Sequence, residues 1–309
     1  MSAPNVLLYC EVSVFGGVTM KWKQSASVIL LFAVVTISAI VFGIVMHTSP
    51  VTPIQYHSKK TFRWISPTRE FAVPVLMYHR VQKLTTKEAS SPLMRDLTVD
   101  PDDFDKQMRF LHDNGFAVLS ILQVQDAVRN HTMLPEKAVA LTLDDGYKDN
   151  FEVAFPILRK YGFPATVFLV TSVVGDTNHV TWDDCKVMMS GFASLESHTV
   201  HHYDLTTLSQ SALDYELQAS KQIIEAKLNS HVTSLAYPSG EFNDTVVVAL
   251  PNCGYEAGWK KGGGPVMPND NPYLLPRIRI HGRTTLIDFK RKVNSGVVCR
   301  QMGIVKSTL

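Results

Sequence analysis

The sequence predicts an α/β domain built on parallel strands, and three observations lead to this prediction. Between about residues 73 and 293, short apolar runs alternate with stretches of helical length. The apolar runs lack polar alternation, as expected of strands that are buried on both faces. Glycine, proline and Asp-Gly steps separate the segments. The alternation predicts a parallel core and does not by itself distinguish a barrel from an open sheet.

The elements follow in order from residue 73. An apolar strand covers residues 73–78, and a helix covers 101–114, with Asp100 before it, Pro101 in its first turn and Gly115 after its end. Further strands are expected at 116–120, 138–143, 165–170, 232–237, 255–259 and 277–280, and further helices at 122–129, 147–161 with a break at Pro156, 211–228 and 285–293.

Two adjacent carboxylates stand at the end of the expected strand 138–143. Asp144 and Asp145 are followed by Gly146, and enzymes with parallel sheets hold catalytic groups at such strand ends. Neighbouring side chains of an extended chain point in different directions, so one carboxylate would bind a cation while the other takes a proton. A plain turn is the alternative, because Asp-Gly is also a turn signal.

A pair of histidines favours the catalytic interpretation. His198 and His202 are four residues apart, which lets both rings reach one ion from a helical turn or from a loop entering a helix. Two imidazoles and one carboxylate, from Asp144 or Asp145, make a metal site with open positions for water. His201 lies between them and is expected to point away.

These segments resemble the polysaccharide deacetylases of the NodB-homology type, carbohydrate esterase family 4. The family signatures Thr-Phe-Asp-Asp-Gly and His-Ser/Thr-x-x-His correspond to residues 142–146 and 198–202. The branch of surface poly-N-acetylglucosamine deacetylases is resembled by residues 73–81, 182–184, 236–242 and 276–278. The resemblance covers about residues 70–295 and implies an irregular (β/α)7 barrel.

The resemblance also implies roles for the charged residues. Asp145, His198 and His202 would hold a divalent metal, zinc first, with cobalt or nickel as alternatives. Asp144 would be the base that takes a proton from the attacking water.

A loop after the strand 232–237 is implied to bind the substrate and its oxyanion. Tyr237 and Ser239 lie in it, and the backbone N–H of Ser239 is the expected donor to the oxyanion. Loop aromatics such as Trp182, Tyr237 and Phe242 are expected either to stack on sugar rings or to belong to the core.

Two departures from the family pattern affect the catalytic groups. Ala236 stands where many members carry an arginine that orients the base. Arg277 is the candidate replacement, and an exposed strand arginine is the alternative. The late histidine that serves the family as general acid has no clear counterpart, so His281 is the expected substitute and His79 the alternative.

Charge and cysteine content narrow the function classes. The chain has 30 basic and 28 acidic residues, a net charge of +2, which is too even for a nucleic-acid binder. The four cysteines form no Cys-x-x-Cys pair, which argues against a zinc knuckle, although a bridge between Cys185 and Cys253 stays open. No protein partner is indicated.

The N-terminus predicts a membrane anchor. Residues 25–46 are apolar and uncharged, long enough to cross the roughly 30 Å hydrocarbon layer. Lys21 and Lys23 precede them and indicate that residues 1–24 stay cytoplasmic, and Met20 is the expected start of translation. An uncleaved anchor is favoured over a cleaved signal peptide. A linker at 47–70, a catalytic domain at 71–300 and a tail at 301–309 follow.

Together these features predict a membrane-anchored, metal-dependent enzyme outside the cytoplasm. It would remove N-acetyl groups from a cell-surface or cell-wall polysaccharide that contains N-acetylglucosamine, and release acetate. An O-acetyl esterase with the same site and a non-catalytic glycan-binding protein are the alternatives.

Overall fold

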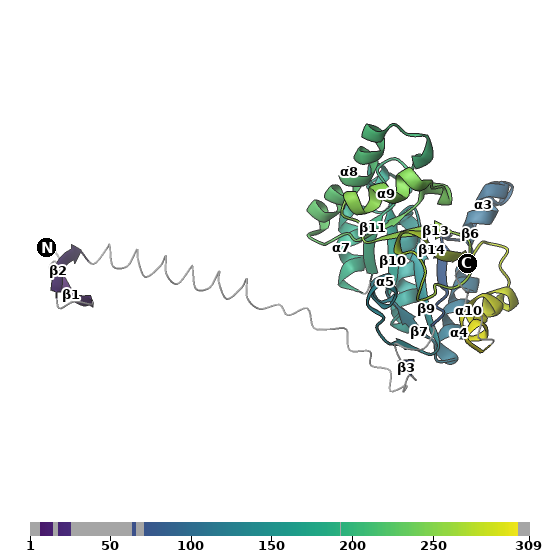
Figure 1. Ribbon diagram of the computed structural model, residues 1–309, viewed down its shortest axis with the longest axis horizontal. Coiled ribbons are helices and arrows are strands. Elements are labelled where there is room, and N and C mark those ends of the chain that lie inside the picture. Colours follow the sequence, from purple (N-terminus) through teal and green to yellow (C-terminus); the bar gives the residue numbers. More distant parts are fainter. Residues whose placement is uncertain (1–6, 15–17, 26–63, 66–70, 192, 302–309) are drawn as a thin grey trace. The chain divides into compact units, whose positions relative to one another are not determined.

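The computed structural model describes residues 7–14, 18–25, 64–65, 71–191 and 193–301 (Figure 1). The chain divides into two units, residues 1–58 and 59–309. In the first unit, β1 (Leu7–Val14) and β2 (Val18–Ser25) form an antiparallel pair. The predicted membrane segment 25–46 lies outside the described residues apart from Ser25. Among the described residues, no helix combines the length and apolar character needed to cross a bilayer.

Parallel strands of the second unit close into a barrel. The ring that the described residues form runs in the order β4 (Val75–Tyr78), β9 (Ala138–Leu143), β10 (Ala165–Leu169), β11 (Ala193–Ser197), β12 (Ser234–Ala236), β13 (Ala257–Lys261) and β14 (Leu275–Arg279). Pairing of β14 with β4 and of β9 with β10 closes it. A further strand, β7 (Ala117–Leu119), pairs with β9. The seven-stranded barrel implied by the family resemblance is confirmed.

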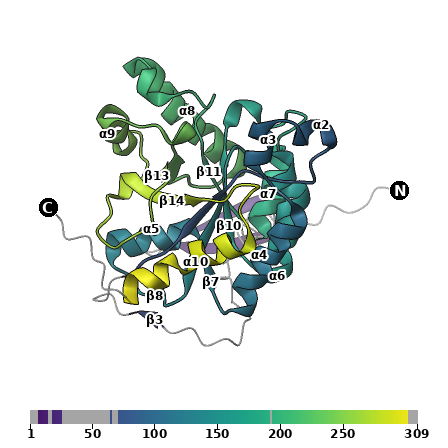
Figure 2. The same cartoon turned by 90° about the vertical axis from the view of Figure 1, so that its right-hand side faces the viewer.

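Helices cover the outside of this barrel (Figure 2). They are α4 (Pro101–Asp113), α5 (Ile121–Asn130), α6 (Phe155–Tyr161), α7 (Trp182–Ser190), α8 (Gln210–Leu228), α9 (Asp244–Asn252) and α10 (Leu286–Gln301). The side chain of Asp100 caps α4 and Pro101 opens it, as the sequence predicts. Pro156 lies in the first turn of α6, directly after a π-helical segment, η1 (Asn150–Ala154). Neither α7, α9 nor β11 was among the predicted elements.

Short elements complete the domain. The strand β3 (Trp64–Ile65), within the predicted linker, pairs with β8 (Leu134–Pro135). Another pair, β5 (Arg80–Val81) and β6 (Thr98–Val99), flanks α2 (Thr86–Ala89) and α3 (Pro92–Leu97). Single turns of 3-10 helix are η2 (Thr171–Val173), η3 (Leu205–Thr207), η4 (Pro238–Gly240) and η5 (Pro272–Leu274).

Alternation along β9 directs the first carboxylate into the barrel. Ala140 packs in the same apolar cluster as Phe168, whereas Leu141 packs in the cluster that contains Leu158 of α6. Side chains alternate along a strand, so Asp144 lies on the side of Ala140. This places its carboxylate in the barrel interior.

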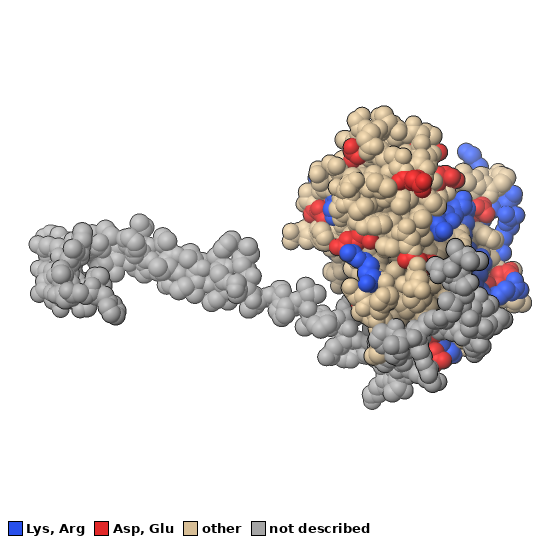
Figure 3. Space-filling model, viewed as in Figure 1, with Lys and Arg blue, Asp and Glu red and all other residues tan. Residues whose placement is uncertain are grey.

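The state of two cysteines and the distribution of surface charge bear on predictions made from the sequence. Cys185 and Cys253 are free thiols, so the bridge left open between them does not form. On the coloured part of the face seen in Figure 3, acidic and basic side chains both occur, with basic ones mainly toward the right-hand edge. That distribution agrees with the near-even charge of the chain.

Candidate active site

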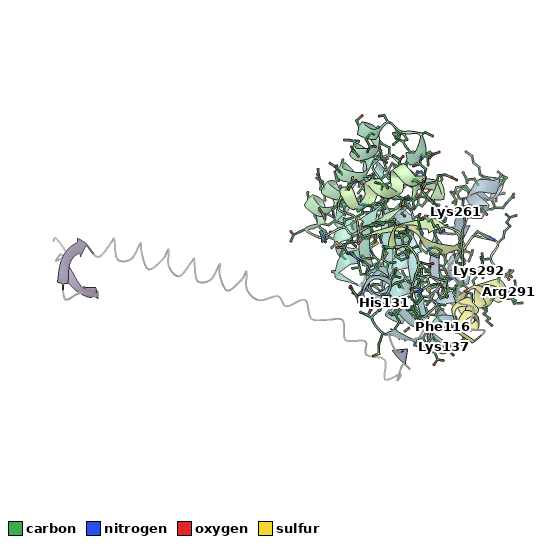
Figure 4. The ribbon with its side chains drawn as sticks, in the orientation of Figure 1. Phe116, His131, Lys137, Lys261, Arg291 and Lys292 are labelled. Carbon is green, nitrogen blue, oxygen red and sulfur yellow. The ribbon has the colours of Figure 1, made fainter. Side chains whose placement is uncertain are left out.

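A cavity of about 280 Å³ opens at the C-terminal ends of the barrel strands. Asp144 and Asp145 come directly after β9, His198 after β11, and Arg277 from β14. The lining also includes His79, His202, Tyr237, Ser239 and, exposed at the end of β13, Lys261 (Figure 4). Parallel strands thus bring residues from distant parts of the sequence to one edge, as strand-end placement predicts.

Asp144 is held by Arg277 in a bidentate ion pair. Nη1 of Arg277 donates to Oδ1 at 2.6 Å and Nη2 donates to Oδ2 at 2.8 Å. The two side chains are only 3% and 1% exposed, and Nη1 also donates to Thr142 Oγ1. Burial alone would raise the pKa of Asp144, but the Arg277 guanidinium opposes it and the pKa falls to about 2. Arg277 is therefore not the exposed strand arginine of the alternative interpretation.

Asp145, His198 and His202 converge on one point. One ligand atom from each lies within 4.8 Å of the others. Oδ1 of Asp145 is 3.5 Å from Nε2 of His198 and 3.7 Å from Nε2 of His202. The backbone of Asp145 is left-handed, with φ 72°, which breaks the strand alternation. Asp145 therefore lines the same cavity as Asp144, while its carboxylate faces the two histidines.

The tautomer of His198 suits it to ligate a cation. Its Nδ1 lies 2.8 Å from the carbonyl oxygen of Ala236, and this contact is a hydrogen bond only if Nδ1 carries the proton. Burial lowers the pKa of His198, so the ring is neutral and Nε2 keeps its lone pair. Asp145, His198 and His202 therefore fit a divalent cation such as zinc.

A buried glutamate holds the loop that carries both histidines. Glu216 of α8 accepts hydrogen bonds from the backbone N–H groups of Val200 and His201, both at 2.9 Å. Its other oxygen lies 2.6 Å from Nδ1 of His201, whose ring is absent from the cavity lining, as expected. The loop is not a helix: Thr199 and His202 have φ values of 69° and 61°.

The loop expected to serve the oxyanion lies in η4, beside the ligands. Ser239 lines the cavity with a left-handed backbone, φ 57°. A Cβ on Gly240 would lie 2.4 Å from Cβ of Lys261, so only glycine fits there. Tyr237 lines the cavity but is buried, and its hydroxyl donates to the carbonyl of Tyr273. Its ring is therefore a core element and not a free platform for a sugar.

The two candidate histidines for the acid role lie in different places. His79 lines the cavity, and its buried Nδ1 has no hydrogen-bond partner among the described residues. Burial lowers the pKa of His79, although the nearby Asp144 and Asp145 oppose the shift. His281 is not part of the cavity lining, and its Nδ1 accepts a hydrogen bond from the N–H of Arg283. The structure thus brings His79, and not His281, to the other site residues.

Some residues of the site were not expected from the sequence. Glu216 looks like any glutamate on a helix, and no sequence signal marks it as buried. Lys261 and Arg279 end barrel strands, so the strand-end rule applied to β13 and β14 would have found them. Of the loop aromatics expected either to stack on sugar rings or to belong to the core, Trp182 and Phe242 pack partly buried against the apolar core.

Comparison with known proteins agrees with this geometry. The family model for polysaccharide deacetylase matches residues 131–258. The Bacillus subtilis protein YxkH, named among the polysaccharide deacetylases, is 30% identical over 227 residues, which cover 74% of this chain and 78% of YxkH. A poly-β-1,6-N-acetyl-D-glucosamine N-deacetylase of Staphylococcus aureus is 30% identical over 237 residues, covering 69% of this chain and 80% of its own.

Solved structures give the same result. The deacetylase PplD of Streptococcus pyogenes, determined in complex with acetate, superposes with a TM-score of 0.68. It is 31% identical, and the match covers 72% of this chain and 98% of PplD. BC0361, a polysaccharide deacetylase from Bacillus cereus, has a TM-score of 0.64 at 30% identity, with 72% of this chain and 69% of the other covered.

Proposed function

The chain belongs to the polysaccharide deacetylase family of enzymes, and from this premise we propose that it removes N-acetyl groups from a polymer containing N-acetylglucosamine. One observation carries the proposal. An ionised carboxylate fixed by a buried arginine, Asp144 with Arg277, lines the same cavity as the ligand set Asp145, His198 and His202. Metal-assisted amide hydrolysis needs both parts.

We propose a divalent cation, zinc first, on Asp145, His198 and His202. A cation bound there would polarise the acetamide carbonyl and lower the pKa of the attacking water, which is needed because Asp144 is itself a weak base. His198 and His202 both direct Nε2 toward Asp145, so each ring would supply one ligand atom. Three protein ligands leave positions open, which is the arrangement of catalytic rather than structural zinc sites.

We propose that Asp144 accepts the proton of the attacking water. With its pKa at about 2, Asp144 is a carboxylate at neutral pH. The fork of Arg277 holds both of its oxygens, so the carboxylate cannot rotate away from the cavity. The arginine thus fixes position and ionisation together.

Two further groups complete the proposed chemistry. The backbone N–H of Ser239 is the proposed donor to the oxyanion, a contribution worth about 3 kcal/mol in comparable sites. His79 is the proposed acid that protonates the leaving amine, because its side chain lines the cavity near Asp144 and Asp145. His281 is not among the residues that line this cavity.

The location of the enzyme is also a proposal. The uncharged apolar segment 25–46 has the length of a membrane span, with Lys21 and Lys23 before it. We propose that it anchors the domain outside the cytoplasm, where wall and surface glycans lie. Cell fractionation with protease treatment of intact cells tests this: a protected catalytic domain contradicts it.

The test of activity is acetate release from a panel of polymers. Poly-β-1,6-N-acetylglucosamine, peptidoglycan and an O-acetylated glycan are each incubated with the zinc-loaded enzyme, with Asp144→Asn as control. Release from an N-acetylated polymer that stops in Asp144→Asn supports the proposal. Release from the O-acetylated glycan alone identifies an esterase. Polymer binding with retained metal and no release from any polymer identifies a glycan-binding protein.

A further inference from the structure

Three aromatic rings lie together outside the catalytic cavity. The ring of His201 stacks on Tyr203 at a centroid distance of 5.1 Å and an interplanar angle of 19°. It also stacks on Tyr215 at 6.3 Å and 22°. The two tyrosines are 53% and 55% exposed. Exposed aromatic groups of this kind mark binding surfaces more often than isolated apolar side chains do.

We call this cluster the tyrosine platform (His201, Tyr203 and Tyr215), and a buried glutamate, Glu216, holds it in place. Glu216 is buried and accepts hydrogen bonds from the backbone N–H of His201, with its second oxygen against the His201 ring. Tyr215 directly precedes Glu216 on α8. A surface that is rigid before binding loses little conformational entropy when a ligand settles on it.

The tyrosine platform is continuous with the catalytic site. Tyr203 directly follows His202, so their Cα atoms are about 3.8 Å apart. His202 is 35% exposed, against 1% for His198 and 15% for Asp145, so the ligand set opens toward solvent at His202. A cavity of about 280 Å³ is small for a ligand site, and a polymer whose reacting sugar lies there must continue over the adjoining surface.

We propose that the tyrosine platform binds a pyranose ring of the substrate polymer, one or more sugars away from the sugar that reacts. The inference rests on the proposed function. A pyranose ring offers a flat face of C–H groups and a rim of hydroxyls, and a tyrosine ring offers an apolar face with a hydroxyl at its edge. The platform therefore selects polymer over short oligosaccharides without touching the reacting atoms.

The experiment compares a long and a short substrate. The ratio of kcat/KM for poly-β-1,6-N-acetylglucosamine to kcat/KM for its disaccharide is measured in Tyr203→Ala, Tyr215→Ala and the double variant. We expect the double variant to lower this ratio about tenfold. Tyr203→Phe keeps the ring and should keep the ratio. Val248→Ala, an exposed apolar change on α9, is the matched control. Bound zinc is measured in every variant.

Several results would overturn the proposal. Equal losses on both substrates, or loss of zinc, would show that the tyrosines only support the His202 loop. An unchanged ratio in the double variant would show that no sugar binds there. A dimer that forms in wild type and not in the double variant would make the rings a contact between copies.

The platform is tested separately if the enzyme releases no acetate at all. That result contradicts the proposed function, and cosedimentation with the insoluble polymer then gives the answer. Loss of cosedimentation in the double variant supports the platform, and unchanged cosedimentation overturns it.

Discussion

Asp144 and Arg277, 133 residues apart in the chain, form a bidentate ion pair in the barrel interior. Asp144 follows β9 and Arg277 belongs to β14, and β4 lies between these two strands in the ring. The guanidinium therefore reaches past β4 inside the barrel, with its central carbon 5.1 Å from the centroid of the Phe168 ring. Ala236 of β12 supplies its carbonyl to His198.

Removing Arg277 should destabilise the fold as well as stop the reaction. In Arg277→Met, the buried carboxylate of Asp144 is left without its partner, and the free energy of unfolding should fall by about 3–5 kcal/mol. Urea unfolding of the metal-free protein measures this. Arg291→Ala is the control, because Arg291 pairs with Asp288 on the exposed face of α10 and should cost less than about 1 kcal/mol (Figure 4). Similar losses in both variants would contradict a buried, structural ion pair.

Substitutions of the two adjacent carboxylates, Asp144 and Asp145, should affect metal binding differently. Asp145→Ala and His202→Ala should lose most of the bound zinc, since each removes a ligand atom. Asp144→Asn should retain zinc and lose most acetate release, because its carboxylate faces Arg277. Zinc per protein after gel filtration is the measurement. If Asp144→Asn loses zinc and Asp145→Ala keeps it, the two roles are reversed.

The position of His79 predicts a loss of rate that His281 does not share. His79→Ala should lower kcat by about 100-fold or more, as expected when a group that transfers a proton is removed. His281→Ala should keep kcat near the wild-type value, because this side chain is absent from the cavity lining. Zinc content should stay unchanged in both. An equal effect of the two substitutions would contradict the proposed acid.

Those parts of the candidate site that depend on the order of residues along the chain could be predicted from the sequence. Asp144 and Asp145 end a long apolar strand, and the four-residue spacing of His198 and His202 needs no tertiary knowledge. Strand-end placement then predicts that they meet. The same rule would have reached Lys261. The barrel itself came from the family resemblance, since strand alternation alone left an open sheet equally acceptable.

Other parts of the site depend on which residues, distant in the sequence, pack together in the fold. No local sequence pattern predicts such contacts. His281 and His79 both follow strands, yet only His79 turns into the cavity. Trp182 and Phe242 are aromatic residues of the kind that stack on sugars, but their rings pack partly buried against the core. The exposed aromatic rings are instead those of Tyr203 and Tyr215. The left-handed backbone of Ser239 is likewise set by its neighbours, because serine has no preference for it.

Glu216 should control metal affinity without touching the metal. In Glu216→Ala, two backbone N–H groups of the histidine loop lose their acceptor, and the loop should loosen around His202. Groups that orient metal ligands in this way typically contribute about 10- to 100-fold to affinity. A chelator competition measures zinc affinity. Glu225→Ala is the control on the same helix, because Glu225 pairs with Lys221 and should leave zinc affinity unchanged. Equal zinc affinity in both variants would contradict the role of Glu216.

Glu196 predicts how stability depends on pH. This residue of β11 is buried, and burial raises its pKa to about 8, although the N–H groups of Ser234 and Thr233 that donate to it oppose the shift. The folded protein therefore holds the proton that the unfolded chain releases near pH 4.5. The corresponding stability is complete below pH 4.5 and is lost as the pH rises to about 8, by at most about 1.4 kcal/mol per pH unit. Glu196→Gln removes this titration. Urea unfolding between pH 5 and 8 should show that the free energy of unfolding depends less on pH in the variant. Titrating histidines are common to both proteins and cancel in the comparison. Parallel profiles would show that Glu196 does not titrate in this range.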